Sequence, residues 1–125
     1  MLEVKALLRN SPVFYRLMGP AFGSRSIAKE IGIHVYDDQD KQWAIAVHGD
    51  CVVGFASVRG LVITDCYVTP EFRLQGIFSR ILAFVLANSK ASTANCTAAS
   101  LPAFLKAGFQ IVSKSKNFTK VKRNA

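Results

Sequence analysis

Paired cysteines are missing from this sequence, and so is any pattern of metal ligands. Its three cysteines, Cys51, Cys66 and Cys96, lie far apart and form no C-x-x-C motif, so neither a disulfide framework nor a zinc site is indicated. His34 and His48 lie near predicted turns and make no ligand pair, and we expect no bound metal. The sequence therefore predicts free thiols, with Cys66 and Cys96 as small buried apolar residues, and a reducing, cytoplasmic setting.

Long apolar runs are also missing. The most apolar stretch, residues 77–87, is interrupted by Ser79 and Arg80 and is shorter than the roughly 20 residues that a membrane-spanning helix needs. Residues 1–10 include three charged side chains and lack the apolar run of a signal peptide. We therefore expect a soluble, unprocessed protein with no membrane partner.

Acidic residues are absent from the C-terminal part of the chain. Residues 72–125 hold nine Lys and Arg and no Asp or Glu, whereas residues 1–71 hold seven basic and eight acidic residues. The formal net charge of +8 is thus concentrated in the second half. A field of this kind favours a phosphate-rich cofactor, a nucleic acid or an acidic partner, and simple solvation of a small domain is the alternative.

With 125 residues, half of them hydrophobic, the chain has the size of one domain, residues 1–125, with a core of its own. The apolar period and the turn residues predict helices over residues 12–18, 24–31, 75–86 and 100–106, and strands over residues 42–48, 51–58, 61–68, 92–97, 109–113 and 117–122. The first three strands form an antiparallel meander with a turn at Gly49-Asp50. Gly19-Pro20 is expected to end the first helix, which starts near Ser11, and Gly32 to end the second.

The segment between the third strand and the third helix carries the most specific motif. Its sequence, V-T-P-E-F-R-L-Q-G-I-F-S over residues 68–79, resembles the acyl-CoA-binding signature of the GNAT family of N-acetyltransferases. Anionic phosphates bind well at a helix amino terminus, whose amides are unpaired, and Gly76 allows a close approach of the backbone.

A second segment, S-L-P-A-F-L-K-A-G-F over residues 100–109, resembles the later signature of the same family and follows the first in the right order. The resemblance covers residue 61 to the end. It implies an α+β fold, an α/β three-layer sandwich in which a mixed, mainly antiparallel sheet has helices on both faces.

The resemblance also implies acetyl-CoA, or another acyl-CoA, as cosubstrate and an amine as acceptor. The residues that it places at the cosubstrate are Tyr67, Val68, Arg73, Leu74, Gln75, Gly76, Ile77, Phe78, Ser79 and Asn95. For Asn95 the alternative is a polar residue of an edge strand. Two positions depart from the family pattern. Phe78 replaces a second small residue and must tuck into the core, and Phe104 replaces the tyrosine that often protonates the leaving thiolate, so the usual general acid is missing.

Two residues near the end of the third strand are candidates for catalysis. Asp65 is a candidate general base for the attacking amine, or else a strand-end carboxylate paired with a nearby Lys or Arg. Tyr67 is a candidate acid or acceptor-pocket wall, or else a half-buried packing residue.

The C-terminal segment is the candidate surface for a partner. Its cations flank Phe118 and suit phosphate backbones and unstacked bases; they are Lys114, Lys116, Lys120, Lys122 and Arg123. The alternative is a solvated edge strand whose lysines discourage aggregation. Besides amine acylation, the sequence leaves open a GNAT-fold enzyme that modifies DNA bases, as the Mom-type modifiers do, or a degenerate GNAT fold that binds nucleic acid or protein. We expect a monomer or a homodimer.

Overall fold

The computed structural model describes residues 2–31, 35 and 40–123, so Gly32 and His34 lie outside the described residues. In chain order the elements are β1 (Leu2–Leu7), α1 (Phe14–Phe22), α2 (Arg25–Ile31), β2 (Lys41–His48), β3 (Cys51–Arg59), β4 (Val62–Val68), the 3-10 turn η1 (Pro70–Phe72), α3 (Ile77–Asn88), β5 (Thr93–Cys96), α4 (Leu101–Lys106), β6 (Gln110–Lys114) and β7 (Thr119–Lys122).

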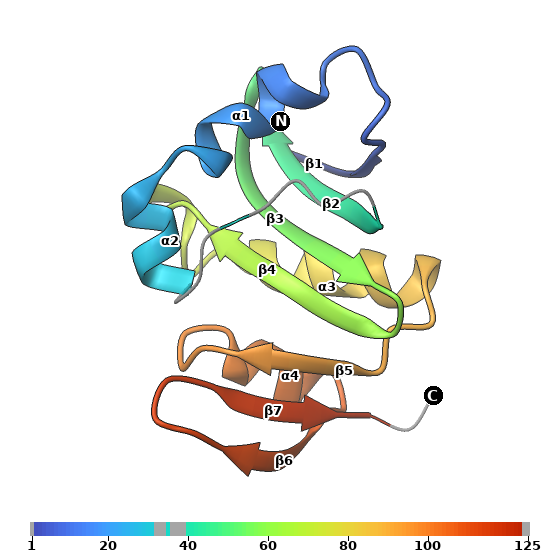
Figure 1. The fold of residues 1–125 in the computed structure, drawn as a ribbon, viewed down its shortest axis with the longest axis vertical. Helices are drawn as coiled ribbons and strands as arrows, with labels where there is room; N and C mark the ends of the chain where they lie inside the picture. Colours follow the sequence, from blue (N-terminus) through green and yellow to red (C-terminus); the bar gives the residue numbers. More distant parts are fainter. Residues whose placement is uncertain (1, 32–34, 36–39, 124–125) are drawn as a thin grey trace.

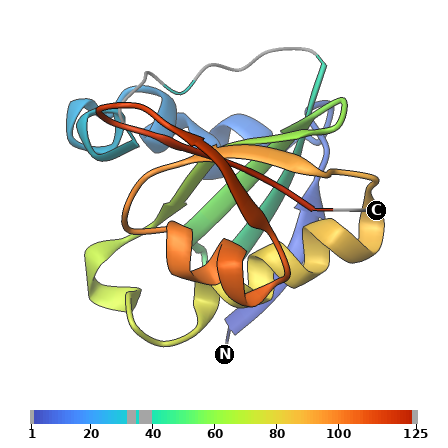
Figure 2. The same cartoon turned by 90° about the horizontal axis from the view of Figure 1, so that it is seen from below.

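One twisted sheet organises the molecule, with strand order β1-β2-β3-β4-β5-β7-β6 (Figure 1). Every neighbouring pair is antiparallel except β4 and β5, which are parallel and are connected through α3. Figure 2 shows α1 and α2 on one face of the sheet and α3 and α4 on the other. The predicted α+β class, a mixed and mainly antiparallel sheet between two helical layers, is confirmed.

The meander β2-β3-β4 forms as predicted, because alternating apolar residues run into tight turns. Gly49 and Gly60 occupy those turns with φ of 62°, a conformation that a residue without a β-carbon adopts readily. A shift in register between Phe55 and Ser57 marks a bulge in the pairing of β3 with β4. This bulge lies beside the candidate site.

The sequence prediction missed β1. This strand pairs antiparallel with β2, with Leu2 opposite His48 and Leu7 opposite Trp43. Its polar and apolar residues alternate, but it is a six-residue edge strand whose partner lies more than thirty residues along the chain. Pairing with the hydrophobic strand β2, rather than a strong local preference, therefore decides its conformation.

The prediction for the first helix was also wrong at both ends. The helix runs through Gly19 and Pro20 instead of ending there, because Phe14, Met18 and Ala21 bury one face of it against the sheet. Burial of that face outweighs the hydrogen bond that Pro20 cannot donate. The second helix agrees with its prediction: the Ser24 hydroxyl accepts a hydrogen bond from the Ile27 amide at 3.1 Å and caps it.

Two apolar clusters hold the layers together. Trp43, Ile45 and Phe55 pack under α1 and α2 on one face of the sheet. On the other face, α3 buries its predicted apolar side against the sheet through Ile77, Ile81, Leu82 and Val85. The same cluster includes residues of β5, α4 and β7, so α3 and α4 share one core with the C-terminal strands.

Candidate active site

The sheet opens between β4 and β5. These strands pair at Val62 with Thr93 and at Ile63 with Ala94, and the β4 bulge follows directly. An extra residue bends a strand and increases its twist, which turns β4 away from β5. A cavity of about 350 Å³ lies there, lined by Asp65 and Cys66 of β4, Asn95 and Cys96 of β5, Ile31 of α2 and Phe118 of the β6–β7 turn. We call it the strand cavity.

The loop after β4 ends on a helix whose first amides are open. Gly76 precedes α3 with φ of 75°, and no side chain caps this helix. A β-carbon built on Gly76 would meet no protein atom within 4 Å. Leu74 also has a positive φ, of 63°, and its side chain is fully exposed. The loop therefore presents unpaired N–H groups and open space, as an anion site requires.

Arg73 joins this loop to the neighbouring elements. Its Nε donates to the Val68 carbonyl at 2.9 Å, its terminal nitrogen pairs with the Glu30 carboxylate of α2, and its guanidinium lies 5.4 Å from the centre of the Tyr67 ring. Arg73 thus lies beside the loop where the resemblance places the cosubstrate, with its charge already shared with Glu30.

Tyr67 faces a second cavity rather than the strand cavity. This cavity of about 390 Å³ lies between α1, α2 and the adjoining ends of β3 and β4, and its lining includes Arg16, Ile27, Phe55 and Thr69. Burial, and after it the carboxylate of Glu30, raise the pKa of the Tyr67 phenol above its ordinary value. We call this space the helix cavity. The two predicted catalytic residues, Asp65 and Tyr67, therefore line different cavities.

Asp65 is buried and paired. Its Oδ2 lies 2.7 Å from Nζ of Lys41 and accepts a hydrogen bond of 2.6 Å from the Ser57 hydroxyl. The Lys41 and Asp65 side chains are only 6% and 1% exposed. The Thr64 hydroxyl is hydrogen-bonded to Ser57 and lies 3.2 Å from the same Oδ2. The alternative that the sequence left open for Asp65, pairing with a basic residue, is present, and Asp65 is also one of the residues that line the strand cavity.

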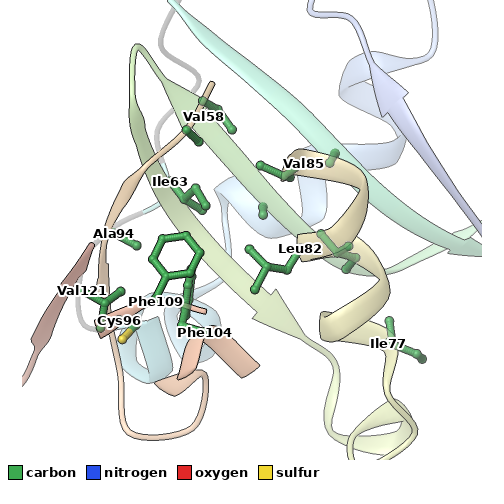
Figure 3. Close-up of a cluster of buried hydrophobic side chains, with 14 of the residues drawn as sticks. Val58, Ile63, Ile77, Leu82, Val85, Ala94, Cys96, Phe104, Phe109 and Val121 are labelled. Atoms are coloured by element: carbon green, nitrogen blue, oxygen red, sulfur yellow. The ribbon is translucent and has the colours of Figure 1, made fainter. Parts of the chain in front are cut away.

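Phe78 and Phe104, the two residues that differ from the family pattern, pack against each other. The Phe78 ring lies 5.7 Å from that of the fully buried Phe104, which also contacts Phe109 at 5.1 Å. Figure 3 shows Phe104 and Phe109 in the core between Leu82 and Ala94. Phe78 tucks against the core as expected. Phe104 thus places an apolar ring in the core at the position where the family often has the hydroxyl of a tyrosine.

The remaining predicted cosubstrate residues lie around the loop and the strand cavity. Val68 packs on the core while its carbonyl accepts from Arg73. Gln75 donates to the Glu71 carbonyl at 3.2 Å, Ile77 is buried, and Ser79 is exposed on the first turn of α3. Asn95 is exposed at the rim of the strand cavity. The structure brings these residues to the carboxyl end of β4 but leaves Tyr67 on the other cavity.

Two polar residues of the site were missed from the sequence, Lys41 and Ser57. Each lies in a strand that reads as apolar, and nothing in its local pattern marks it. Their proximity to Asp65 depends on the pairing of β2 with β3 and of β3 with β4. Lys41 directly precedes the predicted strand 42–48, and its burial is visible only in the folded sheet, so no signal in the sequence indicates it.

The cysteines of the strand cavity are poor nucleophiles. Burial, and then the carboxylate of Asp65, raise the pKa of the Cys66 thiol, and burial also raises the pKa of Cys96. Thiols that stay protonated at neutral pH react slowly. Among the residues that the structure describes, no three His, Cys, Asp or Glu side chains gather into a metal site, and no helix is long and apolar enough to cross a membrane.

The mixed sheet of this α+β fold opens beside an uncapped, glycine-preceded helix, an arrangement that suits a phosphate-bearing ligand. Residues 16–122 match the family model described as the acetyltransferase (GNAT) domain. The chain therefore belongs to the GNAT acetyltransferase family, and the predicted family and enzyme class are confirmed. No curated protein matches the chain by sequence.

Solved structures with the same fold are distant in sequence. A GNAT family acetyltransferase from Elizabethkingia anophelis, with acetyl-CoA bound, is 14% identical at a TM-score of 0.67, over 99% of this chain and 98% of that one. An acyl-CoA N-acyltransferase from Pseudomonas aeruginosa is 12% identical at a TM-score of 0.75, over 99% and 100%. A Bacillus subtilis acetyltransferase in complex with CoA is 14% identical at 0.67, over 100% and 99%.

Proposed function

We propose that this protein, as a single domain over residues 1–125, transfers an acetyl or other acyl group from acyl-CoA to an amine in the cytoplasm. The observation that carries the proposal is that the strand cavity and the uncapped amino end of α3 both lie at the carboxyl end of β4. Two solved structures of the same fold hold acetyl-CoA or CoA, which supports this cosubstrate.

The amides at residues 76–79 are proposed to bind the pyrophosphate, and the backbone of Tyr67 and Val68, together with Asn95, the pantetheine arm. Helix amides provide several donors at once for a multiply charged anion, and the dipole of α3 adds to their attraction. The arm would then enter the strand cavity, where Asn95 lies at the rim. Arg73 holds the loop in place through Val68 and Glu30.

The chemistry is proposed to take place near Asp65. Acetyl-CoA supplies an activated thioester; the amine nitrogen bonds to its acetyl carbon, the carbon–sulfur bond breaks, and Asp65 takes the proton from the nitrogen. Phe104 has no proton to give, so the thiolate is proposed to take one from solvent after it leaves. Tyr67 is proposed to contact the acceptor from the helix cavity. Positioning of the two substrates then supplies much of the rate.

Binding of acetyl-CoA to the purified protein tests this proposal first. We expect calorimetric titration to give a dissociation constant in the low micromolar range, about −8 kcal/mol. Absence of binding would contradict the acyltransferase function and leave the basic surface as the functional one.

We further propose that the acceptor belongs to an anionic macromolecule, with nucleic acid as the first candidate. Figure 1 shows α3 and α4 behind the sheet and no described helix in front of β5, β7 and β6. Thr119 and Val121 point into the core, so Lys120 and Lys122 project from this bare face. The β6–β7 turn also lines the strand cavity through Ser115 and Phe118, so a polyanion bound there would lie close to the acyl group.

Reversing two charges on this face tests the proposed surface. We expect Lys120→Glu with Lys122→Glu to weaken binding of a labelled DNA duplex or single strand at least about tenfold, and binding by the wild type to fall steeply with salt. Fluorescence anisotropy over a range of salt concentrations gives both quantities.

The matched control is Lys5→Glu with Lys106→Glu, which makes the same change in net charge at two exposed positions. Lys5 lies in β1 at the opposite edge of the sheet, and Lys106 lies in α4 on its other face (Figure 2). Equal losses in the two pairs would show that net charge alone attracts the polyanion and would contradict a defined surface. A GNAT-fold enzyme that modifies DNA bases would need the same surface.

A further inference from the structure

Three unfavourable features coincide at Asp65. The residue is a buried carboxylate with a side chain 1% exposed, its φ is 49° although it has a β-carbon, and its Oδ1 has no hydrogen-bond partner among the described residues. Each feature costs stability: burial desolvates the charge, positive φ crowds the β-carbon, and an unpaired buried oxygen forfeits its hydrogen bonds. Features of this kind gather at functional sites, where a ligand completes the arrangement.

The hydrogen bonds of Asp65 all converge on one of its two oxygens. Lys41 and Ser57 contact Oδ2 at 2.7 and 2.6 Å, and the Thr64 hydroxyl lies 3.2 Å away. Because Lys41 comes from β2, Ser57 from β3 and Thr64 from β4, three paired strands fix the plane of the carboxylate. Oδ1 is left as the buried oxygen without a partner among the described residues, and Asp65 is one of the residues that line the strand cavity.

We propose that Lys41 is a positioning residue which, together with Ser57, holds Asp65 so that Oδ1 takes the proton of the acceptor nitrogen. Stability is a weak reason for keeping this pair, since apolar residues of similar volume often replace buried ion pairs without loss. A fixed acceptor oxygen, by contrast, is what proton abstraction requires. The inference rests on the proposed acyl transfer and adds residues that act through Asp65.

Hydroxylamine is the test nucleophile, because the assay then does not require the natural acceptor to be known. Its nitrogen bonds to the acetyl carbon, the carbon–sulfur bond breaks, the nitrogen proton passes to Oδ1, and the thiolate takes a proton from solvent. Release of CoA thiol follows the reaction. We expect Lys41→Met to lower kcat at least about tenfold, and Ser57→Ala about threefold, while the dissociation constant of acetyl-CoA changes less than about twofold.

The decisive comparison is made in an Asp65→Asn background. Residues that act through Asp65 should have no further effect there, so kcat of Lys41→Met/Asp65→Asn should equal that of Asp65→Asn. Ser57→Ala keeps the ion pair and serves where Lys41→Met, with its unpaired buried carboxylate, fails to fold. Arg59→Met is the control: it removes a cation that lies opposite Lys41 in the β2–β3 register but pairs with Asp40 at the surface, and kcat should not change.

The possible results distinguish failure of the positioning role from failure of the proposed acyl transfer. A wild type that neither binds acetyl-CoA nor acetylates hydroxylamine contradicts the proposed function. An active wild type with unchanged kcat in Ser57→Ala and Lys41→Met, or with equal losses whether position 65 is Asp or Asn, overturns the positioning role alone. An active Asp65→Asn variant with wild-type kcat also overturns it, because no proton then passes to Oδ1.

Discussion

Replacing Gly76 with tryptophan is expected to lower the affinity for acetyl-CoA at least about 100-fold, or about 2.8 kcal/mol. Gly76 immediately precedes α3, and a β-carbon built there meets no protein atom within 4 Å. An indole would therefore occupy the open space in front of the unpaired amides, where the pyrophosphate is proposed to bind. Calorimetric titration of the wild type and the variant measures the difference.

The control for Gly76→Trp must reproduce its backbone strain without its bulk at the site. Gly60 has a φ of 62°, its β-carbon would also meet nothing within 4 Å, and it lies in the turn before β4 rather than after it. Gly60→Trp should cost similar stability, on the order of 1–2 kcal/mol, and leave the affinity for acetyl-CoA unchanged. Wild-type affinity in Gly76→Trp would place the pyrophosphate elsewhere.

Phe104→Ala is expected to destabilise the fold by about 3–5 kcal/mol. The side chain is fully buried and contacts both Phe78 and Phe109, so truncation leaves a cavity in the core that α3 shares with α4. For a domain with a total stability of about 5–15 kcal/mol this is a large part. Urea unfolding followed by circular dichroism gives the change in free energy of unfolding.

Leu105→Ala is the matched control for Phe104→Ala, since it truncates the next residue of the same helix at a position 44% exposed. We expect it to cost less than about 1 kcal/mol. Similar losses in the two variants would mean that truncation weakens α4 itself rather than the core beneath it. A small loss in Phe104→Ala would show that the surrounding rings collapse into the space.

The sequence was sufficient to predict features that depend on residues close together in the chain. The β4–α3 junction was predicted because Pro70, Gly76 and the apolar period of α3 lie within a few turns of chain. The packing of Phe78 was predicted from the size of its side chain at a position that the family fills with a small residue. Both depend on neighbours in sequence, and so the pattern of residues alone carries them.

The sequence was not sufficient to predict features that depend on which strands pair in the folded sheet. β1 is defined by its register with β2, and the partners of Asp65 come from three strands that only the folded sheet aligns. The sequence left open that Asp65 pairs with a Lys or Arg, and the structure shows this pair, but nothing local distinguished Lys41 from the other lysines. The separation of Tyr67 from Asp65 into two cavities likewise follows from the extra residue in β4, which no periodic pattern reveals.

The parallel seam between β4 and β5 has a consequence for the energetics of the whole molecule. Four strands lie on one side of it and three on the other, and the strands that meet there share two residue pairs. Because so few strand contacts cross the seam, the core that α3 and α4 share with strands on both sides, rather than strand pairing, holds the two halves together. A ligand that occupies the seam joins them, and at 100 times its dissociation constant it adds about 2.7 kcal/mol to the stability of the folded state. Binding of the cosubstrate at the seam and the stability of the folded sheet are then coupled, so that an increase in one increases the other.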